Sequence, residues 1–165
     1  MATPKPLVLI TGGFGFIGSQ TVENFLQIGY RVRLAGHNEL TCRRFLATHK
    51  DHKDQTETII LPYITALNAF GEAVIGVDGV VHMASSLTHN VEDIERGLIV
   101  PAGNGTLEIL ESTHRHAPRV KHVVLTSSFA ALNDFSTGLR PRRIYDKNQW
   151  NPITHEKAKS NPRVA

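Results

Sequence analysis

The sequence contains a single cysteine, Cys42, in 165 residues. One thiol cannot form a disulfide within the chain or supply a cysteine metal cluster, so disulfide-stabilised and cysteine-ligated metal architectures are excluded. No apolar run approaches the roughly 20 residues that span a bilayer, and the opening MATPKP has no apolar segment of the signal-peptide kind. From these absences we expect a cytoplasmic protein with no membrane segment and no metal site.

Neither positive nor negative charge is in clear excess before the C-terminal end of the chain. The formal net charge is +3, and residues 140–165 contain seven Lys or Arg against two acids. The basic stretches RPRR and KAKSNPR lack the interleaved aromatic residues and helical spacing typical of nucleic-acid-binding surfaces. We therefore expect a solvated loop there and no nucleic-acid partner.

What the sequence does contain is an alternation of short β-branched runs with longer amphipathic ones, at a length suited to one domain. Such alternation predicts βαβ units, and continuously apolar runs such as VVLTS predict strands that are covered on both faces. Strands are expected at 7–11, 31–35, 58–61, 79–83 and 120–126. Helices are expected at 16–28, 39–50, 66–75 and 91–114.

Two of these helices carry further expectations. The first should present Phe16, Ile17, Val22, Phe25 and Leu26 as one apolar stripe. The last contains a proline at position 101 and a glycine at 103, which should kink or loosen it in the middle. After residue 126 the regular pattern ends, and we expect a long loop over 127–165 with room for one short helix.

Glycines are concentrated in one stretch, LVLITGGFGFIG, directly between the first expected strand and the first expected helix. Two patterns can be read there: G-x-x-G-x-x-G from Gly12, Gly15 and Gly18, and G-x-G-x-x-G from Gly13, Gly15 and Gly18. Such glycines permit a tight turn and let a pyrophosphate approach the backbone at a helix N-terminus. The context predicts a doubly wound, Rossmann-type parallel sheet that binds a dinucleotide, with an ordinary strand-to-helix turn as the alternative.

Longer stretches resemble a known family. ITGGFGFIGS resembles the opening of the extended short-chain dehydrogenase/reductases. VDGVVHMAS, PAGNGTLEILES, VKHVVLTSSFAA and YDKNQWNPIT resemble its dihydroflavonol-reductase-like branch, which includes fungal aldehyde and ketone reductases. The likeness runs from residue 7 to 165. It implies an NAD(P)-dependent oxidoreductase that reduces the carbonyl of a small organic substrate, in a setting such as secondary metabolism.

The resemblance also implies roles for individual residues. The glycine turn would meet the cofactor phosphates, HMAS would line the nicotinamide ribose, and Ser128 in LTSSFAA would hydrogen-bond the substrate carbonyl. For His82 a buried strand histidine is an equal alternative. The cofactor-binding residues so implied, together with the charged and aromatic candidates argued next, are Gly12, Gly15, Phe16, Ile17, Gly18, His37, Arg43, Tyr63, His82, Ala84 and Thr126.

Cofactor choice rests on the end of the second expected strand, RLAGHN. An NAD enzyme of this architecture usually has an acid there for the ribose 2′-hydroxyl, whereas this chain has none before Glu39. We therefore expect NADPH, with NADH as the alternative. By the same resemblance, NADP-preferring relatives tend to carry an arginine where this chain has His37, and Arg33, Arg43 or Arg44 could supply the missing charge. Tyr63 stands where relatives place an acid for the adenine amino group.

The family's catalytic Tyr-x-x-x-Lys motif is absent from the 165 residues. In the relatives it follows a segment like NPITHEKAKSNPRVA, so we expect this chain to be the N-terminal half, with a sheet incomplete at its C-terminal side. Apolar surface on VVLTS would then need a C-terminal lobe or a partner subunit. General acid catalysis contributes about 10² to 10⁴ in rate, so the chain alone should turn over feebly. The alternative is a dinucleotide-binding module without turnover.

Overall fold

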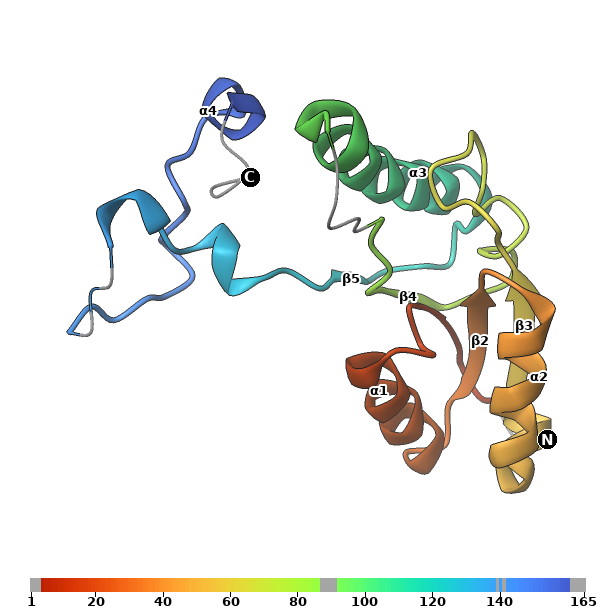
Figure 1. Cartoon of the computed structure of the whole chain (residues 1–165). Helices are drawn as coiled ribbons and strands as arrows, with labels where there is room; N and C mark the ends of the chain where they lie inside the picture. Colours follow the sequence, from red (N-terminus) through yellow and green to blue (C-terminus); the bar gives the residue numbers. More distant parts are fainter. Residues whose placement is uncertain (1–3, 87–91, 139, 141, 161–165) are drawn as a thin grey trace.

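The structure, a computed structural model, describes residues 4–86, 92–138, 140 and 142–160. Five parallel strands form one sheet in the order β3-β2-β1-β4-β5 (Figure 1). Because the chain builds outward from the centre on one side and then on the other, the sheet is doubly wound, as predicted. The strands are β1 Leu7–Thr11, β2 Arg31–Gly36, β3 Thr56–Ile60, β4 Gly79–His82 and β5 Val123–Leu125.

Helices cover both faces of the sheet. The α-helices are α1 Phe16–Gln27, α2 Glu39–Thr48, α3 Val100–His116 and α4 His155–Ser160. A π-helical turn, Glu95–Ile99, leads directly into α3. Short 3-10 helices lie at Lys50–Gln55, Phe129–Ala131 and Phe135–Thr137. No helix within the described ranges is long and apolar enough to cross a membrane.

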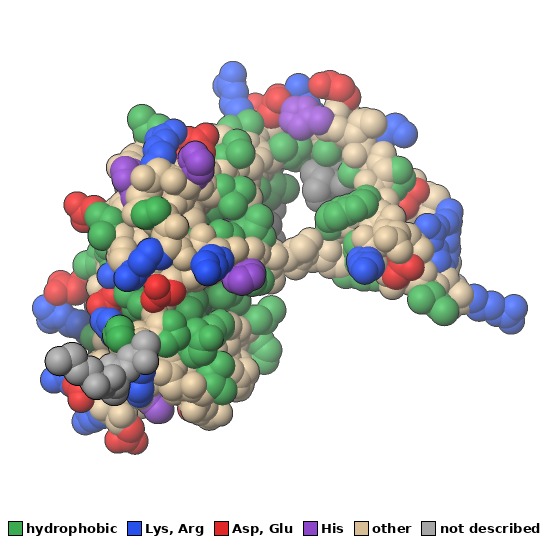
Figure 2. Space-filling model, turned by 180° about the vertical axis from the view of Figure 1, so that it is seen from behind, with side chains coloured by type: hydrophobic (Ala, Val, Ile, Leu, Met, Phe, Trp, Pro, Cys, Tyr) green, Lys and Arg blue, Asp and Glu red, His purple; other side chains and the backbone are tan. Residues whose placement is uncertain are grey.

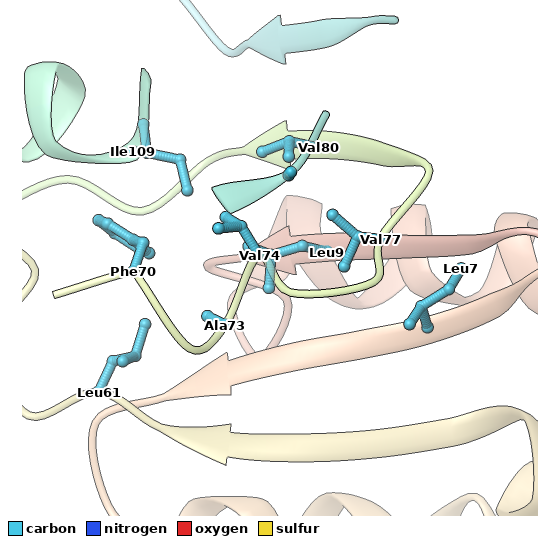
Figure 3. Packing of buried hydrophobic residues seen from close by; sticks show 10 residues of the cluster. Leu7, Leu9, Leu61, Phe70, Ala73, Val74, Val77, Val80 and Ile109 are labelled. Atoms are coloured by element: carbon cyan, nitrogen blue, oxygen red, sulfur yellow. The ribbon is translucent and has the colours of Figure 1, made fainter. Parts of the chain in front are cut away.

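Alternate residues of the central strand face two separate cores. Leu9 on β1 packs with Phe70, Val74 and Ile109 on the α3 side (Figure 3). Its neighbours along the strand face the other way and pack with residues of α1 and α2; this second core contains Val8, Ile10, Val22, Leu26, Val32, Leu34, Phe45 and Val81. Continuous apolarity in β1 thus reflects burial on both faces, as expected for a parallel strand.

The helix expected at 66–75 is wrong. Residues 64–76 form successive turns, several closed by i to i+3 hydrogen bonds such as Gly71 N to Asn68 O at 3.0 Å. Asn68 has a φ of 56° and Gly76 a φ of 75°, and neither angle belongs to a right-handed helix. Phe70, Ala73 and Val74 of this segment are nevertheless buried in the core beside the sheet, whereas Leu67 and Ile75 are exposed. The sequence pattern therefore identified a segment with buried side chains but did not predict its backbone conformation.

The apolar stripe expected on α1 is partly wrong. Val22 and Leu26 are buried, but the residues Phe16 and Ile17 are 97 % and 65 % exposed to solvent. Both lie in the first turn of α1, at the edge of the sheet where β1 has already ended. The sheet therefore offers no apolar surface beneath them.

Two further boundaries differ from expectation. The strand expected at 120–126 is limited to β5, because Val120 N bonds Ala117 O in a turn after α3. Residue 91, at which the helix expected at 91–114 begins, lies outside the described part of the chain. The π-helical turn ends two residues before Pro101, which sits in the first turn of α3 where its missing N–H costs little.

After β5 the chain leaves the sheet as an arm, whose described residues are 127–138, 140 and 142–160 and which stands apart from the main body in Figure 2. Internal hydrogen bonds hold it together: Tyr145 Oη donates to Asn133 Oδ1 at 2.6 Å, and Asn151 N donates to Ala131 O at 2.8 Å. Its last described element, α4, contacts the π-helical turn that precedes α3, where Lys159 Nζ lies 3.0 Å from Glu95 Oε2. Among the described residues, the arm is thus joined to the main body through β5 and through the contacts of α4 with Glu95.

Candidate functional site

A groove of about 650 Å³ lies along the carboxyl ends of four strands. Neighbouring strands β1 and β4 lead to opposite faces of the sheet, and such a switch point opens a crevice in doubly wound folds. The lining residues that the structure describes are Thr11, Gly12, Phe14, Gly15, Ala35, His37, Thr41, Leu61, Pro62, Tyr63, Ile64, Thr65, Met83, Ala84, Ser85 and Ser86.

The turn between β1 and α1 forms the floor of this groove and depends on two glycines. Gly12 has a φ of 70°, and a Cβ there would stand 2.8 Å from Ala84 N. A Cβ on Gly18 would collide with the backbone oxygen of Gly12, because α1 packs directly on the turn. Gly13 faces the core beside Val22 instead. Of the two glycine patterns, the structure therefore uses the one that begins at Gly12.

The N-terminal end of α1 opens on the groove without a side-chain cap. Gly15 is the N-cap residue, and no side chain bonds the first-turn N–H groups there. A Cβ on Gly15 would meet only Gly12 O, at 3.4 Å. Uncapped N–H groups and the helix dipole favour an anion, and the bare backbone leaves room for one. The residues present therefore fit the pyrophosphate of a dinucleotide.

Behind the groove, Thr11 joins the ends of β1 and β4. Its Oγ1 accepts from Met83 N and Ala84 N at 3.1 Å each, and lies 2.9 Å from His82 Nδ1. Two accepted bonds occupy both lone pairs, so we infer that the hydroxyl donates to Nδ1 and that His82 carries its proton on Nε2. Burial lowers the pKa of His82, consistent with this neutral form. Its ring also packs edge-on against Phe70.

The structure brings together only some of the cofactor-binding residues implied by the sequence. Gly12, Gly15, His37, Tyr63 and Ala84 line the groove. The others do not: Phe16 and Ile17 are exposed, Gly18 packs on the turn, His82 is buried behind Thr11, and Arg43 and Thr126 lie elsewhere. A role for these through the backbone stays a prediction.

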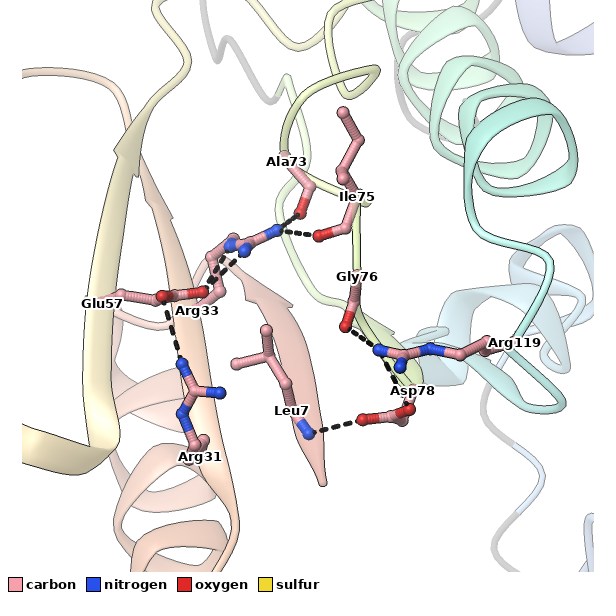
Figure 4. A network of polar contacts seen from close by, with 9 residues as sticks. All are labelled: Leu7, Arg31, Arg33, Glu57, Ala73, Ile75, Gly76, Asp78 and Arg119. Carbon is pink, nitrogen blue, oxygen red and sulfur yellow. Dashed lines mark hydrogen bonds and ion pairs between the residues drawn. The ribbon is translucent and has the colours of Figure 1, made fainter. Parts of the chain in front are cut away.

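Neither Arg33 nor Arg43 turns its charge toward the groove. Arg33 lies 2.7 Å from a Glu57 carboxylate oxygen and donates to Ala73 O and Ile75 O, fastening the turns at 64–76 to the sheet (Figure 4). Arg43 pairs with Glu39 at 2.7 Å on the exposed surface of α2. Among the described lining residues, His37 is the one that can carry positive charge.

Ser128 and Thr126 lie one strand farther along the same edge of the sheet. Thr126 N donates to His82 O at 3.0 Å, which extends the pairing of β5 with β4. Ser128 is exposed, and its Oγ accepts from Ala130 N at 3.2 Å as the cap of the 3-10 helix Phe129–Ala131. Its hydroxyl proton is not used in that bond and can be donated to another acceptor.

Several lining residues were missed from sequence. Phe14 lies within the glycine turn and packs edge-on against Phe45, and Pro62 precedes Tyr63. Ser85 and Ser86 directly follow Ala84 in the stretch HMASS, so the end of the fourth strand was the signal that could have revealed them. In the described residues, no cluster of three or more metal-ligating side chains occurs.

Comparison with known proteins gives a consistent match. Residues 8–153 match the NAD dependent epimerase/dehydratase family. An uncharacterized oxidoreductase of Schizosaccharomyces pombe is 38 % identical over 153 residues, which cover 92 % of this chain and 45 % of that protein. A ketoreductase of Aspergillus niger is 33 % identical over 155 residues, which cover 92 % and 45 %.

Solved structures give the same result. The crystal structure of yeast methylglyoxal/isovaleraldehyde reductase complexed with NADPH has a TM-score of 0.87 at 29 % identity, covering 96 % of this chain and 47 % of that one. The chain thus spans about half the length of the relatives it matches. The match over most of the chain confirms the resemblance found in the sequence: the chain belongs to the NAD dependent epimerase/dehydratase family, that is, to the extended short-chain dehydrogenase/reductases.

Proposed function

We propose that this chain is the cofactor-binding part of an NADPH-dependent reductase that acts on an aldehyde or ketone in the cytoplasm. The observation that carries the proposal is the groove, where the turn at Gly12 and Gly15, the uncapped start of α1 and the end of β4 converge. The names of the relatives, a ketoreductase and a methylglyoxal/isovaleraldehyde reductase bound to NADPH, support the carbonyl class and the cofactor.

Each part of the groove suits a different part of the dinucleotide. We assign the pyrophosphate to the backbone of Gly12 and Gly15, the nicotinamide ribose to Ala84, and the adenine to Tyr63, whose exposed ring can stack on a base. His37, at the end of β2, is assigned to the adenosine ribose. Bound there, NADPH would supply the hydride for the carbonyl carbon.

Ser128 is assigned to the substrate carbonyl. Its Oγ accepts from Ala130 N, which orients the hydroxyl while leaving its proton to donate to a carbonyl oxygen. The chain contains no Tyr-x-x-x-Lys motif to deliver the proton that a reduced carbonyl needs. Because general acids contribute about 10² to 10⁴ in rate, we expect only slow reduction by this chain. The remaining groups would come from a C-terminal lobe or a partner subunit.

Calorimetric titration of the purified chain with NADPH tests the cofactor assignment. Gly15→Ala should weaken binding by about tenfold or more, because the methyl group occupies the approach to the backbone while the φ of −81° at Gly15 suits alanine. Gly103→Ala is the matched control, since a Cβ there meets nothing within 4 Å. Equal affinity in the two variants, or no NADPH binding by the wild-type chain, would overturn the proposal.

The reductase assignment needs a separate test. NADPH consumption with methylglyoxal or isovaleraldehyde should be slow but above the rate without protein, and Ser128→Ala should lower it further. If the Ser128→Ala chain binds NADPH and retains the full rate, the role given to Ser128 is wrong. NADPH binding without any turnover by the wild-type chain would favour a dinucleotide-binding module.

A further inference from the structure

The 3-10 helix that Ser128 caps is too short to hold its own position. It consists of Phe129–Ala131, and a helical turn of this length gains too few hydrogen bonds to form by itself. Ala130 and Ala131 have only a methyl group as side chain, so the polar atoms that can anchor this helix are those of its backbone. The contacts that keep it in place must therefore come from elsewhere in the chain.

On the N-terminal side of Ser128, the sheet fixes the chain. Thr126 N donates to His82 O at 3.0 Å, and Ser128 follows two residues later. His82 ends β4, which leads directly into the groove residues 83–86. Ser128 thus leaves the sheet beside the strand that leads to the groove, and the direction of its hydroxyl depends on the 3-10 helix that follows it.

On the C-terminal side, Asn151 binds this helix from 21 residues beyond Ala130. Its Nδ2 donates to Ala130 O at 3.1 Å, and its backbone N donates to Ala131 O at 2.8 Å. Its Oδ1 accepts from Ile153 N at 3.1 Å, which fixes the amide group with Nδ2 toward the helix. In Figure 1 the segment that leads to α4 passes beside the 3-10 helix. Among the described residues beyond Ser128, Asn151 is the one whose side chain hydrogen-bonds the backbone of this helix.

The bonds of Asn151 and Ser128 meet on one residue. Ala130 accepts the Asn151 amide at its carbonyl oxygen and donates its N–H to Ser128 Oγ at 3.2 Å. Because the amide holds the carbonyl, the helical turn stays closed and the N–H stays directed at the serine. Without that donor the serine side chain is free to adopt its other staggered rotamers. A hydroxyl that must meet a carbonyl oxygen at about 3 Å would then lose its position.

We propose that Asn151 is a positioning residue for Ser128 in carbonyl reduction. The inference rests on the proposed function, in which the Ser128 hydroxyl donates to the substrate carbonyl. Asn151 acts through Ala130: its amide fixes the 3-10 helix, and the helix fixes the serine hydroxyl. Loss of the amide donor should therefore slow NADPH consumption by about threefold to tenfold, the range expected for one hydrogen bond, and leave the affinity for NADPH unchanged.

The test compares Asn151→Asp with a control variant of equal charge. Aspartate keeps the shape and the acceptor for Ile153 N and loses the donor to Ala130 O. Asn148→Asp, at an exposed residue of the same arm, is the matched control. NADPH consumption with isovaleraldehyde should be about threefold to tenfold slower in Asn151→Asp and unchanged in Asn148→Asp. Calorimetric titration should give the same NADPH affinity in both variants and the wild type.

A double variant separates positioning of Ser128 from a general loosening of the arm. In the Ser128→Ala background, Asn151→Asp should cause no further loss of rate, because the hydroxyl that it positions is absent. Amide exchange of Ala130 N–H, followed by NMR, gives a readout that does not depend on turnover. It should be about threefold faster in Asn151→Asp than in the wild type, and unchanged in Asn148→Asp.

The outcomes separate this inference from the proposed function. If the wild-type chain does not turn over, or if Ser128→Ala retains the full rate, the role given to Ser128 fails and this inference fails with it. If Ser128→Ala is slower but Asn151→Asp is not, or if Asn151→Asp lowers the rate equally in both backgrounds, the inference is wrong and the proposed function stands. A loss of rate in Asn151→Asp that disappears in the Ser128→Ala background, with faster exchange at Ala130, would establish it.

Discussion

Thr11 and His82 are register partners at the carboxyl ends of β1 and β4, and their side chains are joined at 2.9 Å. Both are buried, and the threonine hydroxyl also accepts the N–H groups of Met83 and Ala84. The start of the segment that forms one wall of the groove is therefore held by this hydroxyl together with the backbone oxygen of Thr11, which accepts from Met83 N at 3.2 Å. The hydroxyl of Thr11 therefore both satisfies the buried His82 and positions the residues after β4 that line the groove.

Replacing Thr11 by valine should destabilise the chain by about 1–3 kcal/mol, because the N–H of Ala84 and the Nδ1 of His82 lose a buried partner. The shape of the side chain is nearly unchanged, so the effect would come from the hydroxyl. Urea unfolding measures it. Thr11→Ser keeps the hydroxyl and should recover much of the loss; a serine variant no more stable than the valine variant would contradict the role given to this group.

Stability should decrease in mild acid through His82. Burial lowers the pKa of His82 in the folded chain, so below the ordinary histidine value of about 6.5 the unfolded chain binds the proton more readily. The stabilisation is present above about pH 6.5 and is lost as pH falls through the lowered pKa of the folded state.

His82→Asn isolates this effect, because it places an amide oxygen near the position of Nδ1 but cannot titrate. Its free energy of unfolding, measured from about pH 8 to pH 5, should fall less steeply than that of the wild type. Parallel curves for the two chains would show that the other eight histidines account for the pH dependence.

Gly18→Ala should destabilise the fold, since the added methyl group collides with the backbone oxygen of Gly12 and the turn must shift. Overpacking of this kind costs about 1–3 kcal/mol. Gly103→Ala, at an open helical position, should instead stabilise by about 0.5–1 kcal/mol. Chemical denaturation of both variants checks the pair, and a neutral Gly18→Ala substitution would mean that α1 does not pack on the turn as described.

Glu95 should control the attachment of α4. It pairs with Lys159 at 3.0 Å and lies 3.9 Å from His155 Nε2, and its hydrogen bond is the main reason that the pKa of Lys159 is raised. Glu95→Gln should accelerate tryptic cleavage after Lys157 and Lys159 by about threefold with little change in global stability.

High salt should have the same effect on the wild type, because it screens exposed ion pairs, and should add little in Glu95→Gln. Glu92→Gln, an exposed acid three residues earlier, is the matched control. Cleavage rates that are equal in all three chains would show that other contacts hold α4.

The sheet and the glycine turn could be predicted because each depends on local sequence. Buried parallel strands require short apolar runs, and a turn like that at Gly12 requires a residue that tolerates positive φ. The segment 66–75 shows the limit of this reasoning. Phe70, Ala73, Val74 and Val77 have helical spacing and are fully buried, yet the backbone between them turns. Periodicity reports which side chains face the core and leaves the hydrogen-bonding pattern open.

The residues of the candidate site could be predicted only where their place after a strand is enough to bring them to the groove. Gly12, Gly15, His37 and Ala84 follow strand ends, and they line the groove. The partner of an arginine depends on tertiary neighbours: Glu57 binds Arg33 from the adjacent strand, 24 residues away. The same reason hid the role of Thr11, whose partners lie more than 70 residues farther along the chain.

The central claim is that the groove beside the glycine turn binds NADPH, and amide hydrogen exchange with and without NADPH tests it most directly. We predict slower exchange at residues 12–18 and 83–86, which form the floor and one wall of the groove, and unchanged exchange in the C-terminal half of α3. Protection that is absent from the glycine turn, or that lies instead in the arm, would contradict the claim.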